Sequence, residues 1–122
     1  MKKNNRNLPF QAYNTLPVDF DGDGVHELVG GLGHQGTKDI LKGNGEKIGN
    51  IGEKGTVAMA AKLLDHPGEQ IFVYYPDGTI RIWVDKNAKD SGKALERYRH
   101  PFYQRNRALT ATGYNLVNLG GL

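Results

Sequence analysis

Short runs of apolar residues separated by glycine-rich polar turns dominate the pattern along the chain. The alternation is clearest at residues 79–84, where isoleucine and valine face one side of a predicted strand and Trp83 faces the other. Another apolar run covers residues 71–75, and residues 76–78 (PDG) between the two runs form a turn sequence. The pattern therefore predicts an antiparallel hairpin in this part of the chain.

The same criteria predict further short strands. Residues 43–45 (GNG) supply the Asn-Gly signal of a second hairpin. The alanines at residues 56–64 would also suit a helix, but a repeat described below favours a strand. Weaker alternation predicts strands at residues 97–103 and 109–114. The other predicted strands cover residues 13–18, 27–32, 39–42 and 46–51, and turns or loops are expected at residues 34–36, 52–55, 85–93 and in a tail at 116–122.

One loop between two of these strands, residues 19–27 (DFDGDGVHE), has the pattern of a calcium site. Its aspartates stand at alternate positions, so their side chains can point inward, and its glycines can take the positive φ that a tight turn requires. Calcium takes roughly 6–8 oxygen ligands and needs several carboxylates within one turn. The predicted ligands are Asp19, Asp21, Asp23, the carbonyl of Val25 and Glu27.

The spacing of this loop argues against an EF-hand. An EF-hand requires a bidentate glutamate at position 12 and a helix on each side, whereas position 12 counted from Asp19 is Gly30. The residues after the loop favour a strand. The other alternative is an acidic turn that binds nothing, but four carboxylates this close repel one another unless a cation lies between them.

The acidic loop and its flanking apolar residues form a unit, and a second, degraded copy of this unit follows about 44 residues later. Residues 63–73 (LLDHPGEQIFV) again combine an apolar lead-in, an acidic loop containing glycine and an apolar strand. The copy keeps Asp65 and Glu69 but lacks the other carboxylates, so we expect it to have lost calcium. The spacing lies within the about 40–50 residues per blade of propeller repeats.

Composition places the chain among β-rich globular domains. It has 122 residues, of which 38% are hydrophobic and 24% charged, and its 17 glycines favour many turns and short strands. The absence of cysteine excludes disulfides and thiolate metal sites. No apolar run approaches the ~18 residues of a membrane span, and the basic residues 1–7 are not followed by the apolar region of a signal peptide.

The net charge of +3 describes a basic surface that carries one concentrated acidic loop. Such a surface favours an anionic partner, such as a uronic-acid polysaccharide, a nucleic acid or an anionic membrane. Residues 97–107 hold four arginines interleaved with aromatic residues. Arginine binds carboxylates through bidentate hydrogen bonds, and tyrosine rings can stack on sugars. The predicted substrate-binding residues are Arg99, His100, Tyr103, Arg105 and Tyr114, and no catalytic base is assigned.

Two other interpretations of residues 97–107 stay open. The arginines can form the solvated face of an edge strand, with the aromatic rings in the core. The combination of basic and aromatic residues is also typical of a platform for single-stranded nucleic acid. No groove-reading motif accompanies it, which argues against nucleic acid.

Acidic loops followed by strands at blade spacing resemble the FG-GAP type of calcium-binding β-propeller repeat. A more specific resemblance, from about residue 17 to 115, is to the C-terminal part of the rhamnogalacturonan lyases. Those enzymes are calcium-rich β-propellers that cleave pectin by β-elimination, so the resemblance implies an extracellular or periplasmic protein. It is carried by residues 64–65 (LD), 69–71 (EQI), 77–82 (DGTIRI), 99–104 (RHPFYQ) and 114–115 (YN).

The sequence thus predicts an all-β chain of antiparallel β-propeller-type blades, with about two blades of an incomplete propeller. A mobile tail at residues 1–12 would precede a partial propeller at residues 13–122, with blade units at about 13–55 and 56–115. The resemblance implies binding or β-elimination of pectin-type acidic polysaccharide within a larger assembly. The alternative is a non-catalytic, calcium-stabilised carbohydrate-binding or adhesion module. Exposed strand edges would favour a homo-oligomer, and no membrane partner is expected.

Overall fold

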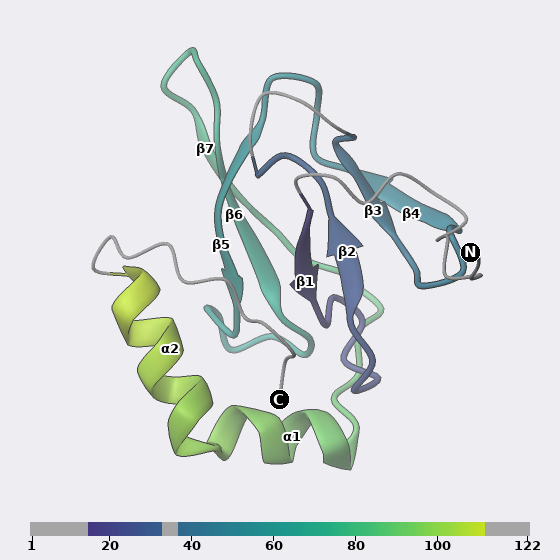
Figure 1. The fold of residues 1–122 in the computed structure, drawn as a ribbon, viewed down its shortest axis with the longest axis vertical. Coiled ribbons are helices and arrows are strands. Elements are labelled where there is room, and N and C mark those ends of the chain that lie inside the picture. Colours follow the sequence, from purple (N-terminus) through teal and green to yellow (C-terminus); the bar gives the residue numbers. More distant parts are fainter. Residues whose placement is uncertain (1–14, 33–36, 112–122) are drawn as a thin grey trace, which may run out of the picture.

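The computed structural model describes residues 15–32 and 37–111, and Figure 1 shows two antiparallel sheets followed by two helices. The first sheet has the order β1-β2-β3-β4, with strands Leu16–Val18, Glu27–Val29, Asp39–Leu41 and Lys47–Asn50. The second has the order β5-β6-β7, with strands Thr56–Ala61, Gln70–Tyr74 and Ile80–Trp83. The helices are α1, Gly92–Arg99, and α2, Pro101–Ala111.

Both predicted hairpins are present, and each turn contains a glycine with positive φ. Gly45, at φ 91°, lies between β3 and β4, where the Glu46 amide donates to Asn44 Oδ1 at 2.8 Å. Gly78, at φ 88°, donates its amide to the Tyr75 carbonyl at 3.0 Å between β6 and β7. Because a positive φ strains any residue with a Cβ, these glycines favour the observed registers.

The hydrophobic core lies between the two sheets. The residues that form it are Val18, Phe20, Val29, Ile40, Ile51, Val57, Ile71 and Val73, all buried. Trp83 packs against this cluster and donates its indole N–H to Tyr75 Oη at 3.0 Å, whereas Ile80 and Ile82, which alternate with Arg81 and Trp83, are 60% and 39% exposed. The predicted alternation of β7 is therefore confirmed, with the Trp83 side facing the core.

The strands predicted at residues 97–103 and 109–114 are wrong where the structure describes them. Residues 92–99 and 101–111 are helical instead. The Ser91 hydroxyl caps α1 by accepting the Ala94 amide at 3.1 Å, and helix-forming residues follow it. Pro101 opens α2, where its fixed φ and missing N–H suit the first helical turn.

The fold is mostly β, with two antiparallel sheets, two short helices and no closed barrel among the described residues. The run at residues 56–64, which also suited a helix, is a strand over Thr56–Ala61. The two sheets occupy residues 16–50 and 56–83. Their assignment as propeller blades, and the proposed blade boundaries, stay predictions.

Some expectations lie outside the described residues. They concern the tail at residues 1–12, the turn at 34–36, the end of the last predicted strand at 112–114 and the glycine-ended tail at 116–122. Among the helices that the structure describes, none is long and apolar enough to cross a membrane.

Candidate metal centre

The acidic loop connects β1 to β2 and is built by its own side chains. The amide of Asp23 donates to Asp21 Oδ1 at 3.1 Å, and the amide of Val25 donates to Asp23 Oδ1 at 2.8 Å. Gly22 has a φ of 84°, and a Cβ there would lie 2.6 Å from the Lys89 carbonyl oxygen. The sequence needs glycine at this position both for its backbone conformation and for close packing against the segment that leads into α1.

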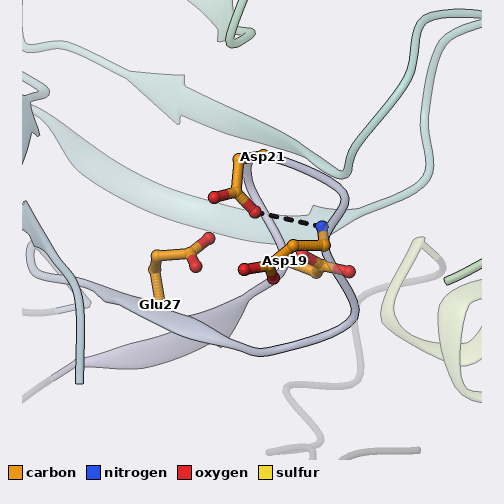
Figure 2. Close-up of side chains that lie close together, drawn as sticks. Asp19, Asp21 and Glu27 are labelled. Carbon is orange, nitrogen blue, oxygen red and sulfur yellow. Dashed lines mark hydrogen bonds between the residues drawn. The ribbon is translucent and has the colours of Figure 1, made fainter. Parts of the chain in front are cut away.

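Four carboxylates of the loop converge on one place. Asp19, Asp21, Asp23 and Glu27 each offer an oxygen, and these oxygens all lie within 4.8 Å of one another. Figure 2 shows the carboxylates of Asp19, Asp21 and Glu27 turned towards a shared space. Of the predicted ligands, these four side chains are therefore brought together as expected, and the cluster can hold a metal ion. The Val25 side chain points outward and is 58% exposed.

Burial makes this cluster costly without a compensating cation. Asp19 is fully buried and Glu27 is 2% exposed. Burial, followed by repulsion from the neighbouring aspartates, raises the pKa of Glu27 to about 7, although the Phe20 amide that donates to it acts in the opposite direction. Burial likewise raises the pKa of Asp19, against the stabilising Gly24 amide and Arg97. A bound cation would favour the ionised form of both groups.

Two basic side chains already offset part of the charge. Lys42 Nζ lies 3.5 Å from Asp21 Oδ2, and Arg97 Nη1 lies 3.1 Å from Asp19 Oδ2. When ionised, the four carboxylates carry four negative charges, and these two side chains supply two positive ones. The remaining charge matches one divalent cation, so the residues present fit such an ion.

Arg97 of α1 ties the helix to the loop. Besides its ion pair with Asp19, its Nη2 donates to the Gly24 carbonyl at 2.8 Å. The side chain is buried, and its Nε has no hydrogen-bond partner among the residues that the structure describes. The sequence places Arg97 in the basic and aromatic cluster of residues 97–107 that is expected to bind an anionic partner, whereas the structure buries its side chain. The helical capping residue Ser91 is the signal that would have placed it correctly.

A second buried contact ties α2 to the same loop. Tyr103 Oη donates to Glu69 Oε2 at 2.5 Å, and Glu69 Oε1 accepts the Asp19 amide at 2.6 Å. Tyr103 Oη also accepts the Lys62 amide at 2.7 Å. Burial, followed by the charge of Glu69, raises the pKa of Tyr103 above its ordinary value. These bonds fix α2 next to the second sheet, and Figure 1 shows α2 beside β5 and α1 beneath the strand-connecting loops.

The strand pairs define an internal repeat of the two sheets. Val18 pairs with Glu27 where β1 meets β2, and Ala61 pairs with Gln70 where β5 meets β6. Ala61 and Gln70 lie 43 residues after Val18 and Glu27, respectively. Glu27 and Gln70 also play the same role, because each side-chain oxygen accepts the backbone amide of the residue seven positions earlier. Glu27 accepts from Phe20, and Gln70 accepts from Leu63.

This register places Lys62, and not an acidic residue, at the counterpart of Asp19. The Lys62 ammonium donates to the carbonyls of His66 and Gly68, and Gly68 is the counterpart of Val25. Its nitrogen also lies 3.5 Å from Asp90 Oδ2 and 5.2 Å from the centre of the Tyr98 ring. A lysine cation thus lies among the carbonyls of the second loop.

The second loop needs no acidic cluster to satisfy its backbone. Gln70 Oε1 accepts the amides of Leu63 and Leu64, at 2.9 and 2.8 Å, and its Nε2 donates to the Gly68 carbonyl at 2.9 Å. The repeat predicted from the sequence treats Asp65 as a retained acidic residue of the first loop. In the structure Asp65 is exposed, and the strand registers make it the counterpart of Gly22. The predicted spacing of about 44 residues differs by one from the observed 43, so the sequence did not identify Lys62 as the counterpart of Asp19.

The predicted substrate residues are only partly at the surface. Arg99, His100 and Arg105 are exposed, and Tyr114 lies outside the described residues. His100 Nδ1 accepts the Phe102 amide at 3.1 Å, so this side chain helps to cap α2. Tyr103 corrects the expectation, because it is 5% exposed and its hydroxyl is engaged inside the protein.

Comparison of the chain with protein-family models, with curated proteins and with solved structures finds no match. The resemblance to the rhamnogalacturonan lyases therefore rests on the sequence motifs alone.

Proposed function

We propose that the acidic loop binds one calcium ion through Asp19, Asp21, Asp23, the Val25 carbonyl and Glu27. The observation that carries this proposal is Lys62 in the second loop. Its ammonium lies against the Gly68 carbonyl, the counterpart of the Val25 carbonyl that we assign as a ligand. Because the Lys62 ammonium occupies this place in the second loop, we infer that a metal cation occupies the corresponding place in the first loop.

Calcium suits this ligand set better than magnesium does. The proposed ligands are all oxygens, and several carboxylates within one loop suit the variable coordination geometry of calcium. Magnesium requires nearly ideal octahedral geometry and retains several waters. In this proposal the ion is structural: it would join the end of β1 to the start of β2 and fix the loop on which Arg97 docks.

We further propose that the chain is a calcium-stabilised module that binds a pectin-type acidic polysaccharide and is related to the rhamnogalacturonan lyases. The exposed Arg99 and Arg105, together with a net charge of +3, support an anionic ligand. The burial of Arg97 and Tyr103 removes two members of the predicted cluster from the surface. We therefore favour a binding module over a self-sufficient lyase, and β-elimination would require groups from a larger extracellular or periplasmic assembly.

Thermal unfolding with calcium and with chelator tests the metal proposal. A ligand that binds only the folded state stabilises it by about 2.7 kcal/mol at 100 times its dissociation constant, so calcium should raise the unfolding midpoint. Asp21→Asn should abolish this shift. Asp77→Asn is the matched control, because Asp77 accepts the amide two residues later at 2.9 Å as Asp21 does, but in the β6–β7 turn. An equal calcium shift in wild type and Asp21→Asn would contradict the site.

Calorimetry with polygalacturonate, in calcium and with neutral dextran as control, tests the ligand proposal. We expect binding of polygalacturonate only, weakened severalfold by the double substitution of Arg99 and Arg105 by glutamine. Incubation with rhamnogalacturonan tests cleavage separately, because the unsaturated uronate products absorb in the ultraviolet. Binding without a rise in absorbance is the expected result, and equal affinity for dextran would rule out the acidic ligand.

A further inference from the structure

One face of the three-stranded sheet is apolar and is left uncovered by residues 15–32 and 37–111, the part of the chain that the structure describes. Tyr74 pairs with Ile80, and Phe72 with Ile82, so these four side chains lie together on one side of β6 and β7. Tyr74, Ile80 and Ile82 are 48%, 60% and 39% exposed, and Phe72 is half-buried. We call Phe72, Tyr74, Ile80 and Ile82 the outer face. Its opposite side, with Ile71, Val73 and Trp83, packs into the core.

The internal repeat indicates what kind of structure suits this face. Phe72 lies 43 residues after Val29, and its partner Ile82 corresponds to Ile40, the partner of Val29. Val29 and Ile40 are 0% and 1% exposed, because the other sheet packs on them. The same surface is therefore covered by a β-sheet in the first copy of the repeat, whereas no described strand or helix covers it in the second.

The charge and exposure of the described residues indicate which β-sheet would cover the outer face. The outer face contains no ionisable side chain other than the Tyr74 phenol, so it offers nothing to recognise an acidic or basic partner and nothing to repel itself. The corresponding side of the four-stranded sheet is less open, since Leu41 is 6% exposed and Leu28 is half-buried. We propose that the outer face packs against the outer face of a second copy of this chain, as a twofold dimer of stacked sheets.

Sedimentation velocity over a range of protein concentrations tests this dimer. Wild type should associate reversibly, and Ile82→Lys should weaken the association at least tenfold because it buries a charge in the interface. Leu95→Lys is the matched control, since Leu95 is a similarly exposed apolar residue, 40% exposed, on α1. It should associate like wild type, and circular dichroism should confirm that both variants are folded.

Cross-linking provides a second, independent test, because the chain contains no cysteine. Ile82→Cys should form a disulfide-linked dimer under mild oxidation, whereas Leu95→Cys should stay monomeric. A monomer at all concentrations would overturn the proposal. So would equal association of Ile82→Lys and wild type, or equal cross-linking of the two cysteine variants.

Discussion

At the scale of single residues, one position decides how each loop is held. The first loop has Asp19 where the second has Lys62. Asp19 lies among other carboxylates, whereas Lys62 donates to backbone carbonyls of its loop. The acidic ligands of the first loop could be predicted from their alternate spacing, because the chemistry of calcium requires it. The role of Lys62 could not be predicted, because matching the two loops by their acidic residues gives a different correspondence from the one that the strand registers show.

The raised pKa of Glu27 predicts how the calcium-free protein responds to pH. In the unfolded chain Glu27 has its ordinary pKa of 4.5, whereas in the folded protein its pKa is about 7. The folded state therefore binds more protons between these values, and its free energy of unfolding should fall as pH rises through this range. At about 1.4 kcal/mol per pKa unit, the loss is on the order of 3 kcal/mol. Urea unfolding in calcium-free buffer from pH 5 to 7.5 measures it.

A matched variant and added calcium separate this effect from other titrations. Glu27→Gln should flatten the pH dependence of the calcium-free protein, since the amide does not titrate. Saturating calcium should also remove the fall, because the proposed ion favours the carboxylate. A free energy of unfolding that rises between pH 5 and 7.5 without calcium would contradict the assignment.

At the scale of elements, the sequence predicted strands far better than helices. The strands over residues 70–83 were predictable because alternating apolar positions and the Pro-Asp-Gly turn agree. The helices were missed because the basic and aromatic residues 97–103 were interpreted as a strand face, although His100 and Pro101 divide them between two helices. Their position depends on buried bonds from Arg97 and Tyr103 to distant loops, which local pattern does not reveal.

The Arg97 ion pair predicts a coupling between α1 and the acidic loop. Arg97→Met removes a buried charge and leaves Asp19 uncompensated, which should cost about 3–5 kcal/mol of stability in the calcium-free protein. Calcium should recover part of this loss, because it supplies positive charge to Asp19. Urea unfolding, followed by circular dichroism at a helix-sensitive wavelength, measures both values.

The exposed Arg99 offers the control for this prediction. Arg99→Met removes the same charge from the same helix without a buried partner, so its effect should stay below about 1 kcal/mol. If the two variants are equally stable without calcium, Arg97 does not hold the loop and the helix together.

At the scale of the whole molecule, two copies of one unit form two packed sheets, and the helices bridge their loops. The first sheet continues into a fourth strand, whereas the chain after β7 turns towards the acidic loop, where the Lys89 amide donates to the Asp21 carbonyl at 3.1 Å. The sequence predicted the repetition because the pattern of loop and strand recurs. It did not predict the bridge, since the bridge is formed by contacts between residues up to 78 positions apart.

The number of calcium ions bound per chain tests the central claim most directly. Isothermal titration calorimetry of the metal-stripped protein with calcium at pH 7.5 should give one ion per chain, and Asp21→Asn should lose the binding. An absence of binding at millimolar calcium would contradict the site in the first loop. Two ions per chain would contradict Lys62 as the cation of the second.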